Sequence, residues 1–278
     1  MSPQYPMSPR HPLTAPELRD LHDRQLRREA QPDGPGCRIE REGDVVRRTG
    51  PAHAWNGVVW SALDAAGADG AIAAQIDHYR AAGLPFEWKL SSHDTPADLG
   101  ARLLAAGFTA GEPETVMVAE AAALPARVAL PDGVELVDVT DEAGVRQVVE
   151  VHERAFGTDS SHLGRQLIDH LAADPRTVTA VVALADGQPV SAARLELCPG
   201  TDFAGLWGGG TVEAWRGRGL YRALVAHRAR LAASRGHRYV HVDAAPTSRP
   251  ILQRLGFLPL TTTTPYTYDV RQVPVVRP

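Results

Sequence analysis

The chain has 278 residues, of which 44% are hydrophobic and 22% charged, so it has room for two globular domains of ordinary size. Its formal net charge of -4 gives no electrostatic reason to expect a nucleic acid or an anionic membrane as a partner. Two distant cysteines, Cys37 and Cys198, exclude a disulfide framework and a CxxC metal site, and no run of 18 apolar residues occurs. Since the Pro-rich N-terminus also lacks an apolar signal region, we expect a cytoplasmic protein without a metal ion.

The first half begins with a Pro-rich segment at residues 1–12, which we expect to be a disordered lead-in. Apolar residues at helical spacing predict helices at 16–28, 71–82 and 97–106. Short apolar or alternating runs predict strands at 37–41, 45–48, 55–60, 86–90 and 115–119. The Leu-Pro and Leu-Pro-Asp-Gly turns between 121 and 136 predict a domain boundary, which gives domains at 13–125 and 132–278.

The second half repeats this order of elements. We expect strands at 134–138, 177–184, 190–197, 204–212 and 239–243, helices at 141–156, 160–173, 220–236 and 248–255, and a β-rich tail. Three landmarks recur at a constant offset of 149 residues: Gly70 with Gly219, Asp94 with Asp243, and 107–108 with 256–257. The sequence therefore predicts an α/β (α+β) fold of two related domains in tandem, each a mixed central sheet flanked by helices.

The most informative motif is the segment from Arg216 to Tyr221, Arg-Gly-Arg-Gly-Leu-Tyr, which lies between a strand and a helix. A glycine-rich turn at a helix start offers unpaired backbone N–H groups and the positive end of the helix dipole, and arginines add charge that suits a pyrophosphate. Neither a Walker loop nor a Rossmann turn matches this spacing. At the corresponding positions the first half has Gly67 and Asp69, so we expect it to bind no phosphate.

This segment resembles the coenzyme A loop of the GNAT acetyltransferase superfamily, [QR]-x-x-G-x-[GA], with Tyr221 in place of the last small residue. The resemblance covers about residues 132 to 270, and the tandem layout is similar to that of mycothiol synthases. It implies acetyl-CoA as cosubstrate, with no metal, and a splayed strand where the Gly208–Gly210 run favours a bulge. The residues that we assign to the coenzyme A site are Thr211, Val212, Arg216, Gly217, Arg218, Gly219, Leu220, Tyr221, Arg222 and Ser248.

The catalytic residues depart from the pattern of this family. Many members use a Glu on the strand before the loop and a Tyr four residues ahead of the Gly-Phe pair, but here the strand has no acid after Asp202 and the Tyr position is Leu252. We predict Glu196 as general base and Tyr266 as the donor to the thiolate. Glu196 shares a strand face with Arg194, so an ordinary Arg–Glu pair is the alternative for this residue. Asp243 or solvent is the alternative base, although an acid at the end of a strand is also typical of a helix cap.

These observations predict an N-acetyltransferase that transfers an acetyl group directly from acetyl-CoA to the amine of a small molecule. The alternative is a non-catalytic acyl-CoA-binding sensor or scaffold, which the missing Glu and Tyr would explain. The first domain is expected to be a degenerate copy. A homodimer is left open, and the acceptor is not specified by the sequence.

Overall fold

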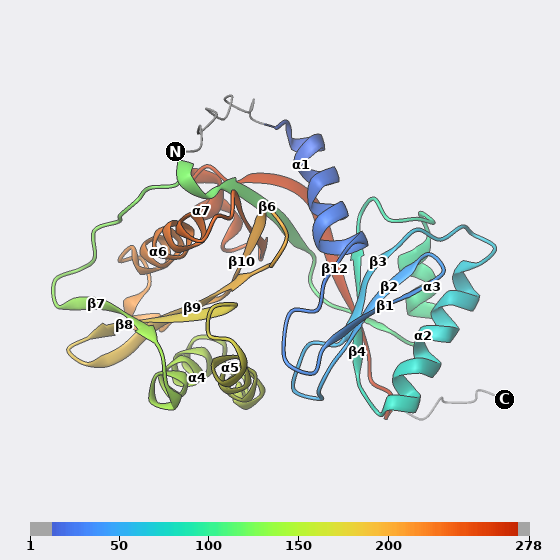
Figure 1. The fold of residues 1–278 in the computed structure, drawn as a ribbon, viewed down its shortest axis with the longest axis horizontal. Helices are drawn as coiled ribbons and strands as arrows, with labels where there is room; N and C mark the ends of the chain where they lie inside the picture. Colours follow the sequence, from blue (N-terminus) through green and yellow to red (C-terminus); the bar gives the residue numbers. More distant parts are fainter. Residues whose placement is uncertain (1–12, 272–278) are drawn as a thin grey trace, which may run out of the picture.

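One mixed sheet of 12 strands runs through residues 13–271, the part of the chain that this computed structural model describes (Figure 1). The strand order is β1-β2-β3-β4-β12-β6-β11-β10-β9-β8-β7, and the short β5 pairs with β12. The lead-in predicted at residues 1–12 lies outside the described residues, as do residues 272–278.

The first half forms one lobe of the molecule (Figure 1). Its elements are α1 (Ala15–His22), the π-helical turn η1 (Asp23–Arg28), β1 (Arg38–Glu42), β2 (Val45–Thr49), β3 (Gly57–Ser61), α2 (Ala68–Ala82), β4 (Phe86–Ser91), α3 (Leu99–Ala105), β5 (Thr109–Ala110), β6 (Glu114–Glu120) and η2 (Ala121–Ala123). Thr14 is the N-cap residue of helix α1, and its side chain forms a capping box with Glu17. The core of this lobe packs α2 and α3 against the sheet around Tyr79, Phe86 and Trp88.

The second half forms the other lobe. Its elements are β7 (Val134–Val139), α4 (Glu142–Phe156), α5 (Ser161–Ala173), β8 (Val178–Ala185), β9 (Gln188–Leu197), β10 (Phe203–Thr211), η3 (Glu213–Trp215), α6 (Leu220–Ser234), β11 (Tyr239–Ala244), α7 (Arg249–Arg254) and β12 (Leu258–Tyr268). Leu195, Leu206 and Val240 pack with Val225 and Ala229 of α6, so α6 covers one face of this part of the sheet. Helices α4 and α5 pack on β8 and β9 in a separate core, on the other face.

The two halves exchange strands at the centre of the sheet. Strand β6, from the first half, lies between β11 and β12, and it is antiparallel to both. Strand β12, from the second half, pairs along its outer edge with β4 of the first half, where Pro265 lies opposite Lys89. Each lobe therefore contains one strand that the sequence assigns to the other half, while the division at 125/132 stays a prediction from sequence.

The structure confirms the mixed α/β class and the order of the predicted helices and strands. Helix α2 is longer than predicted, and residues 23–28 continue α1 as a π-helical turn. The short strand β5 and the 3-10 turns η2 and η3 were not predicted. The helix-cap hypothesis for Asp243 is wrong, because this carboxylate accepts a hydrogen bond from Lys89 Nζ and Ser248 precedes α7 without a side-chain cap.

Candidate active site

The loop before α6 has the backbone geometry of an anion-binding turn. Gly217 and Gly219 have φ of 76° and 89°, a left-handed conformation that favours glycine. Gly219 precedes Leu220, the first residue of a 15-residue helix, and no acidic residue lies in the first turn. The first backbone N–H groups of a helix lack intrahelical acceptors, so this turn can donate them to a phosphate.

Three exposed arginines surround this turn. Arg216 is held in place, since its Nε donates to the carbonyl of Thr211 at 3.1 Å and its Nη2 to the carbonyl of Ala155 at 3.0 Å. The guanidinium of Arg218 lies 4.6 Å from the ring centre of Trp215, and that of Arg222 lies beside Gly219. The predicted residues from 216 to 222 thus come together around one helix end. Arg216 is hydrogen-bonded to two backbone carbonyls, whereas Arg218 lies against Trp215 and Arg222 lies beside Gly219.

Thr211 and Val212 lie next to this turn, but their polar groups already have partners. The hydroxyl of Thr211 is 2.7 Å from that of Ser191, and its carbonyl accepts from Arg216. The N–H of Val212 donates to the carbonyl of Val190 at 3.0 Å. These two residues fix the end of β10, which positions the turn.

The glycine run of β10 forms the expected bulge. The register of β10 against β9 shifts between Trp207 and Gly210. A side chain at Gly208 would meet His152, whose Nε2 lies 2.7 Å from the Gly208 carbonyl oxygen, and one at Gly209 would come within 2.8 Å of the Tyr221 ring. Small residues are therefore required here by packing on both faces of the strand.

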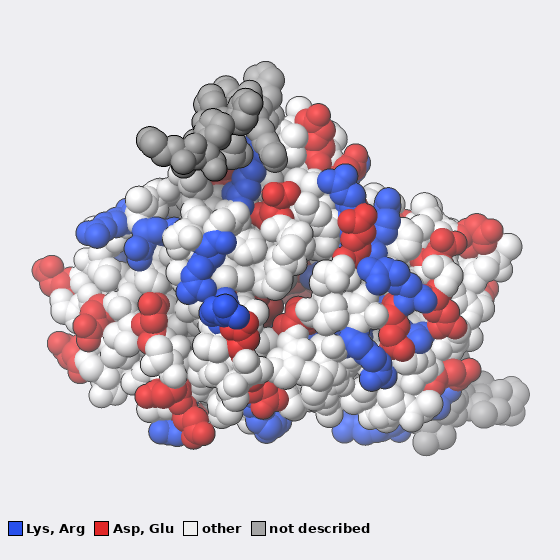
Figure 2. All heavy atoms as spheres, viewed as in Figure 1, with Lys and Arg blue, Asp and Glu red and all other residues white. Residues whose placement is uncertain are grey.

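The bulge coincides with a splay between the parallel strands β10 and β11. Only residues 203–205 pair with residues 239–241, and beyond them the two strands separate. A cleft of about 590 Å³ opens on the sheet face opposite α6, lined by Glu87, Lys89 and Glu114 of the first half and by Glu196, Trp207 and Asp243 of the second. Figure 2 shows a hollow between the two lobes, on a surface where both signs of charge are mixed.

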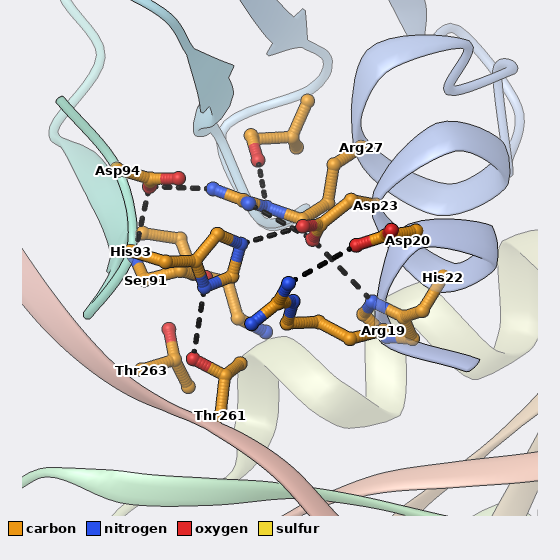
Figure 3. Close-up of polar contacts among 12 residues, drawn as sticks. Arg19, Asp20, His22, Asp23, Arg27, Ser91, His93, Asp94, Thr261 and Thr263 are labelled. Atoms are coloured by element: carbon orange, nitrogen blue, oxygen red, sulfur yellow. Dashed lines mark hydrogen bonds and ion pairs between the residues drawn. The ribbon is translucent and has the colours of Figure 1, made fainter. Parts of the chain in front are cut away.

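The π-helical turn after α1 forms one wall of the cleft, and a buried polar network holds it (Figure 3). Arg27 donates to Asp23 at 3.0 Å and to Asp94 at 2.6 Å, and His93 Nε2 lies 2.5 Å from Asp23. Burial alone would raise the pKa of Asp23, but hydrogen bonds from His22, His93 and Arg27 hold it well below its usual range. The network ties this wall to the loop after β4 and so fixes the shape of the cleft.

Lys89 connects the two halves across the splay. Its ammonium donates to Asp243 on β11 and lies 5.3 Å from the ring centre of Trp207 on β10. Burial would raise the pKa of Asp243, but Lys89 lowers it, so the carboxylate stays ionised. His241, on the same face, is neutral because burial lowers its pKa to about 3.

The two predicted catalytic residues are in different environments. Glu196 lines the cleft, where its carboxylate accepts from Arg194 Nε at 2.7 Å. Tyr266 pairs with Trp88 on β4 and packs in the core of the first half, with its hydroxyl against Gly100 of α3. The structure brings Glu196 to the cleft and does not bring Tyr266 there.

Tyr221 and Ser248 contact each other on the α6 side of the splay. Burial raises the pKa of Tyr221, while the neighbouring Arg228 and Ser248 oppose the rise. Arg228 is 2% exposed and donates to the carbonyls of Leu224, Arg194 and Trp207. Burial lowers its pKa to about 10, and no ion pair to it occurs within residues 13–271, so it is a buried cation behind the bulge.

The sequence analysis missed four residues around the splay: Lys89, Glu114, His152 and Arg228. A signal was present for Lys89, which is the only lysine of the chain. No comparable signal marked the other three, because their neighbours come from distant segments.

Among residues 13–271, no group of three or more His, Cys, Asp or Glu side chains is arranged to hold a metal ion. Within the same residues, every helix is too short or too polar to span a bilayer.

The second half of the chain contains a segment that matches a known protein family. Residues 145–257 match the acetyltransferase (GNAT) family. A GCN5-related N-acetyltransferase from Kribbella flavida superposes with a TM-score of 0.67 at 19% identity, covering 91% of this chain and 95% of that one. A tandem GNAT protein from the clavulanic acid biosynthesis pathway superposes with a TM-score of 0.58 at 14% identity, covering 94% of this chain and 98% of that one. A conserved protein of unknown function from Staphylococcus epidermidis superposes with a TM-score of 0.63 at 16% identity, covering 87% of this chain and 96% of that one. No curated protein matches the chain.

Residues 145–257 therefore match the acetyltransferase (GNAT) family model, and the chain as a whole has the fold of solved GNAT proteins, one of which is a tandem GNAT protein.

Proposed function

We propose that the protein transfers an acetyl group from acetyl-CoA to the amine of a small molecule. The observation that carries the proposal is the splay between β10 and β11, which has the arginine-bearing start of α6 on one side and an acidic cleft on the other. A thioester lying in the splay would face an acceptor in the cleft. This arrangement suits direct transfer between two bound substrates.

The turn before α6 would hold the pyrophosphate of acetyl-CoA. Backbone N–H groups of the first turn donate to phosphate oxygens, and Arg218 and Arg222 contribute charge from exposed positions. Arg216 would act mainly by holding the turn against β10 and α4, because its guanidinium already donates to two carbonyls.

A small amine fits the charge of the cleft. Its carboxylates Asp33, Glu196 and Asp243 are neutralised by Arg48, Arg194 and Lys89. Glu87 and Glu114 have no ion pair within residues 13–271, so these two carboxyl groups are available to accept hydrogen bonds from an ammonium group.

Tyr221 replaces Tyr266 in our proposal as the group that protonates the leaving thiolate. Its ring lies against Gly209 at the bulge, and its environment contains the buried cation Arg228. A nearby cation lowers the cost of forming the phenolate after the proton has left. This assignment also gives a role to the tyrosine that stands where related loops have a small residue.

The test measures free thiol released from acetyl-CoA in the presence of tyramine, putrescine, glucosamine or glycinamide. We expect at least one amine to raise the rate well above that of hydrolysis, with the N-acetylated product detected by mass spectrometry. Binding of coenzyme A without amine-dependent thiol release would favour the acyl-CoA sensor instead. The cytoplasmic location and the homodimer remain predictions from sequence.

A further inference from the structure

Glu114 is placed in the second half's cleft by the strand exchange. As the first residue of β6, it lies opposite Thr263 of β12, and two residues later Val116 lies opposite Asp243 of β11. Residues directly opposite in an antiparallel pair point to the same face, and so do residues two apart. Glu114, Val116, Asp243 and Thr263 therefore share one face, and all four line the cleft.

The groups around Glu114 come from every strand that borders the cleft. Carboxylates outnumber cations among them. The other titratable and charged groups that line the same cleft are His22, Arg27, Asp33, Arg48, Glu87, Lys89, Glu112, Arg194, Glu196, Cys198, His241 and Asp243. Lys89 is committed to Asp243 and Arg194 to Glu196, while His241 is neutral. Glu114 thus faces ionised Asp243 without a cation of its own.

These neighbours change the proton affinity of Glu114. Burial, together with the charges of Asp243 and Glu87, raises its pKa to about 7, while Lys89 opposes the rise. A base works best when its pKa lies near the working pH. Glu196, the base predicted from sequence, is held instead by a direct hydrogen bond from Arg194.

We propose that Glu114, contributed by the first half of the chain, is the general base that deprotonates the acceptor amine in the second half's cleft. The assignment rests on the proposed function. The Glu114 carboxylate takes one proton from the acceptor's ammonium group, and the freed nitrogen lone pair forms a C–N bond to the acetyl carbon. The C–S bond breaks with its electrons on sulfur, and Tyr221 protonates the thiolate. The acceptor nitrogen then loses a second proton, which passes through solvent to the Tyr221 phenolate and restores its hydroxyl. Glu114 releases its own proton to water.

The kinetic test compares two nucleophiles. One is the faster of tyramine and putrescine, whose amino groups are protonated at neutral pH, and the other is aniline, which is already neutral. With the protonated amine, we expect the unmodified protein to show an acidic limb near pH 7 in its pH–rate profile, and Glu114→Gln should lower turnover by about 100- to 10,000-fold and remove that limb. With aniline the loss should be at least tenfold smaller. Equal losses for both nucleophiles, or an acidic limb retained in Glu114→Gln, would overturn the proposal.

A second measurement does not depend on finding an acceptor. In protein labelled with carbon-13 glutamate, the carboxyl resonance that disappears in Glu114→Gln should titrate near pH 7. Titration at the ordinary glutamate pKa would overturn the assignment even if the enzyme is active. Glu120→Gln is the matched control, since Glu120 lies on β6 six residues away and pairs with Arg238 at 2.8 Å outside the cleft.

The outcomes separate this inference from the proposed function. If no amine, aniline included, releases thiol from acetyl-CoA, the function fails whatever Glu114 does. If amines are acetylated and Glu114→Gln keeps the normal rate and pH profile while it folds and binds coenzyme A, only the base assignment fails.

Discussion

The first turns of α2 and α6 occupy comparable places in the two halves, and their charges are opposite. At the start of α2, the N–H of Gly67 donates to Asp64 at 2.7 Å, and Asp69 pairs with Arg102 at 2.9 Å. The start of α6 has no acidic residue and is surrounded by arginines. Carboxylates of the protein lie at the N-terminus of α2, whereas the N-terminus of α6 can accept an anion.

The halves differ in a second way, which the strand exchange makes visible. The proposed cosubstrate turn belongs wholly to the second half, whereas the cleft draws Glu87, Lys89 and Glu114 from the first. A half that has no arginine-bearing turn of its own therefore still supplies side chains to the cleft of the other half.

The largest effect is expected from removing the first half. A chain that begins at residue 131 lacks β6, so β11 and β12 lose the strand that joins them, and the apolar side chains of Met117 and Val118 leave two cores. We expect this chain to be insoluble or unfolded and to bind no coenzyme A, as measured by circular dichroism and calorimetry. A folded fragment that binds coenzyme A normally would show that the halves are independent.

Tyr221→Phe removes the proposed proton donor and keeps the ring against Gly209. Turnover should fall about 100-fold, because an unprotonated thiolate is a poorer leaving group, while affinity for coenzyme A changes little. Steady-state rates and calorimetry measure the two quantities separately. Tyr266→Phe is the competing variant, and a larger loss there than in Tyr221→Phe would favour the tyrosine predicted from sequence.

Arg218→Ala tests the charge difference between the two helix starts. The variant should weaken binding of coenzyme A about tenfold by calorimetry, which corresponds to about 1.4 kcal/mol for one exposed charge-assisted contact. Asp69→Ala, at the start of α2, is the control and should leave the affinity unchanged. If the two variants behave alike, the turn before α6 does not hold the pyrophosphate.

The smallest effects are shifts in the acidic limb of the pH–rate profile. Ionised Asp243 raises the pKa of Glu114, so Asp243→Asn should lower that pKa and move the limb below pH 7. Lys89 acts in the opposite direction, so Lys89→Met should move the limb to higher pH. Each variant breaks a partly buried ion pair and should also lower thermal stability. Shifts of the same sign in pH–rate profiles would contradict the electrostatic account.

Much of this fold could be predicted because helices and strands follow local patterns. The periodicity of residues 71–82 and 141–156 gave α2 and α4 directly. Strand partners are non-local, and nothing in the sequence of residues 114–120 indicated that they lie between β11 and β12. The turn that we propose for coenzyme A is a contiguous motif, so it could be proposed from the sequence for the same local reason as the helices.

The catalytic residues were harder to predict because their properties come from their neighbours. Glu196 was chosen from strand alternation, which gave the correct face and also indicated the alternative of an ordinary pair with Arg194, which the structure shows. The tail strand carrying Tyr266 was expected near the thiolate, but pairing with β4 directs this ring into the first half. The pKa of Glu114 is raised by its burial and by the charges of Asp243 and Glu87, which lie on other strands, so none of these causes could be read from the sequence around it.

The exchanged strands also constrain how the chain folds during synthesis. Strand β6 leaves the ribosome more than a hundred residues before β11, its partner, and β4 waits still longer for β12. Until then the first half exposes unpaired strand edges, which are prone to association with other chains. The contacts that close the sheet are distant in sequence, so closure should be slow. The two lobes therefore cannot mature one after the other, and the chain reaches its native sheet only when both halves are present.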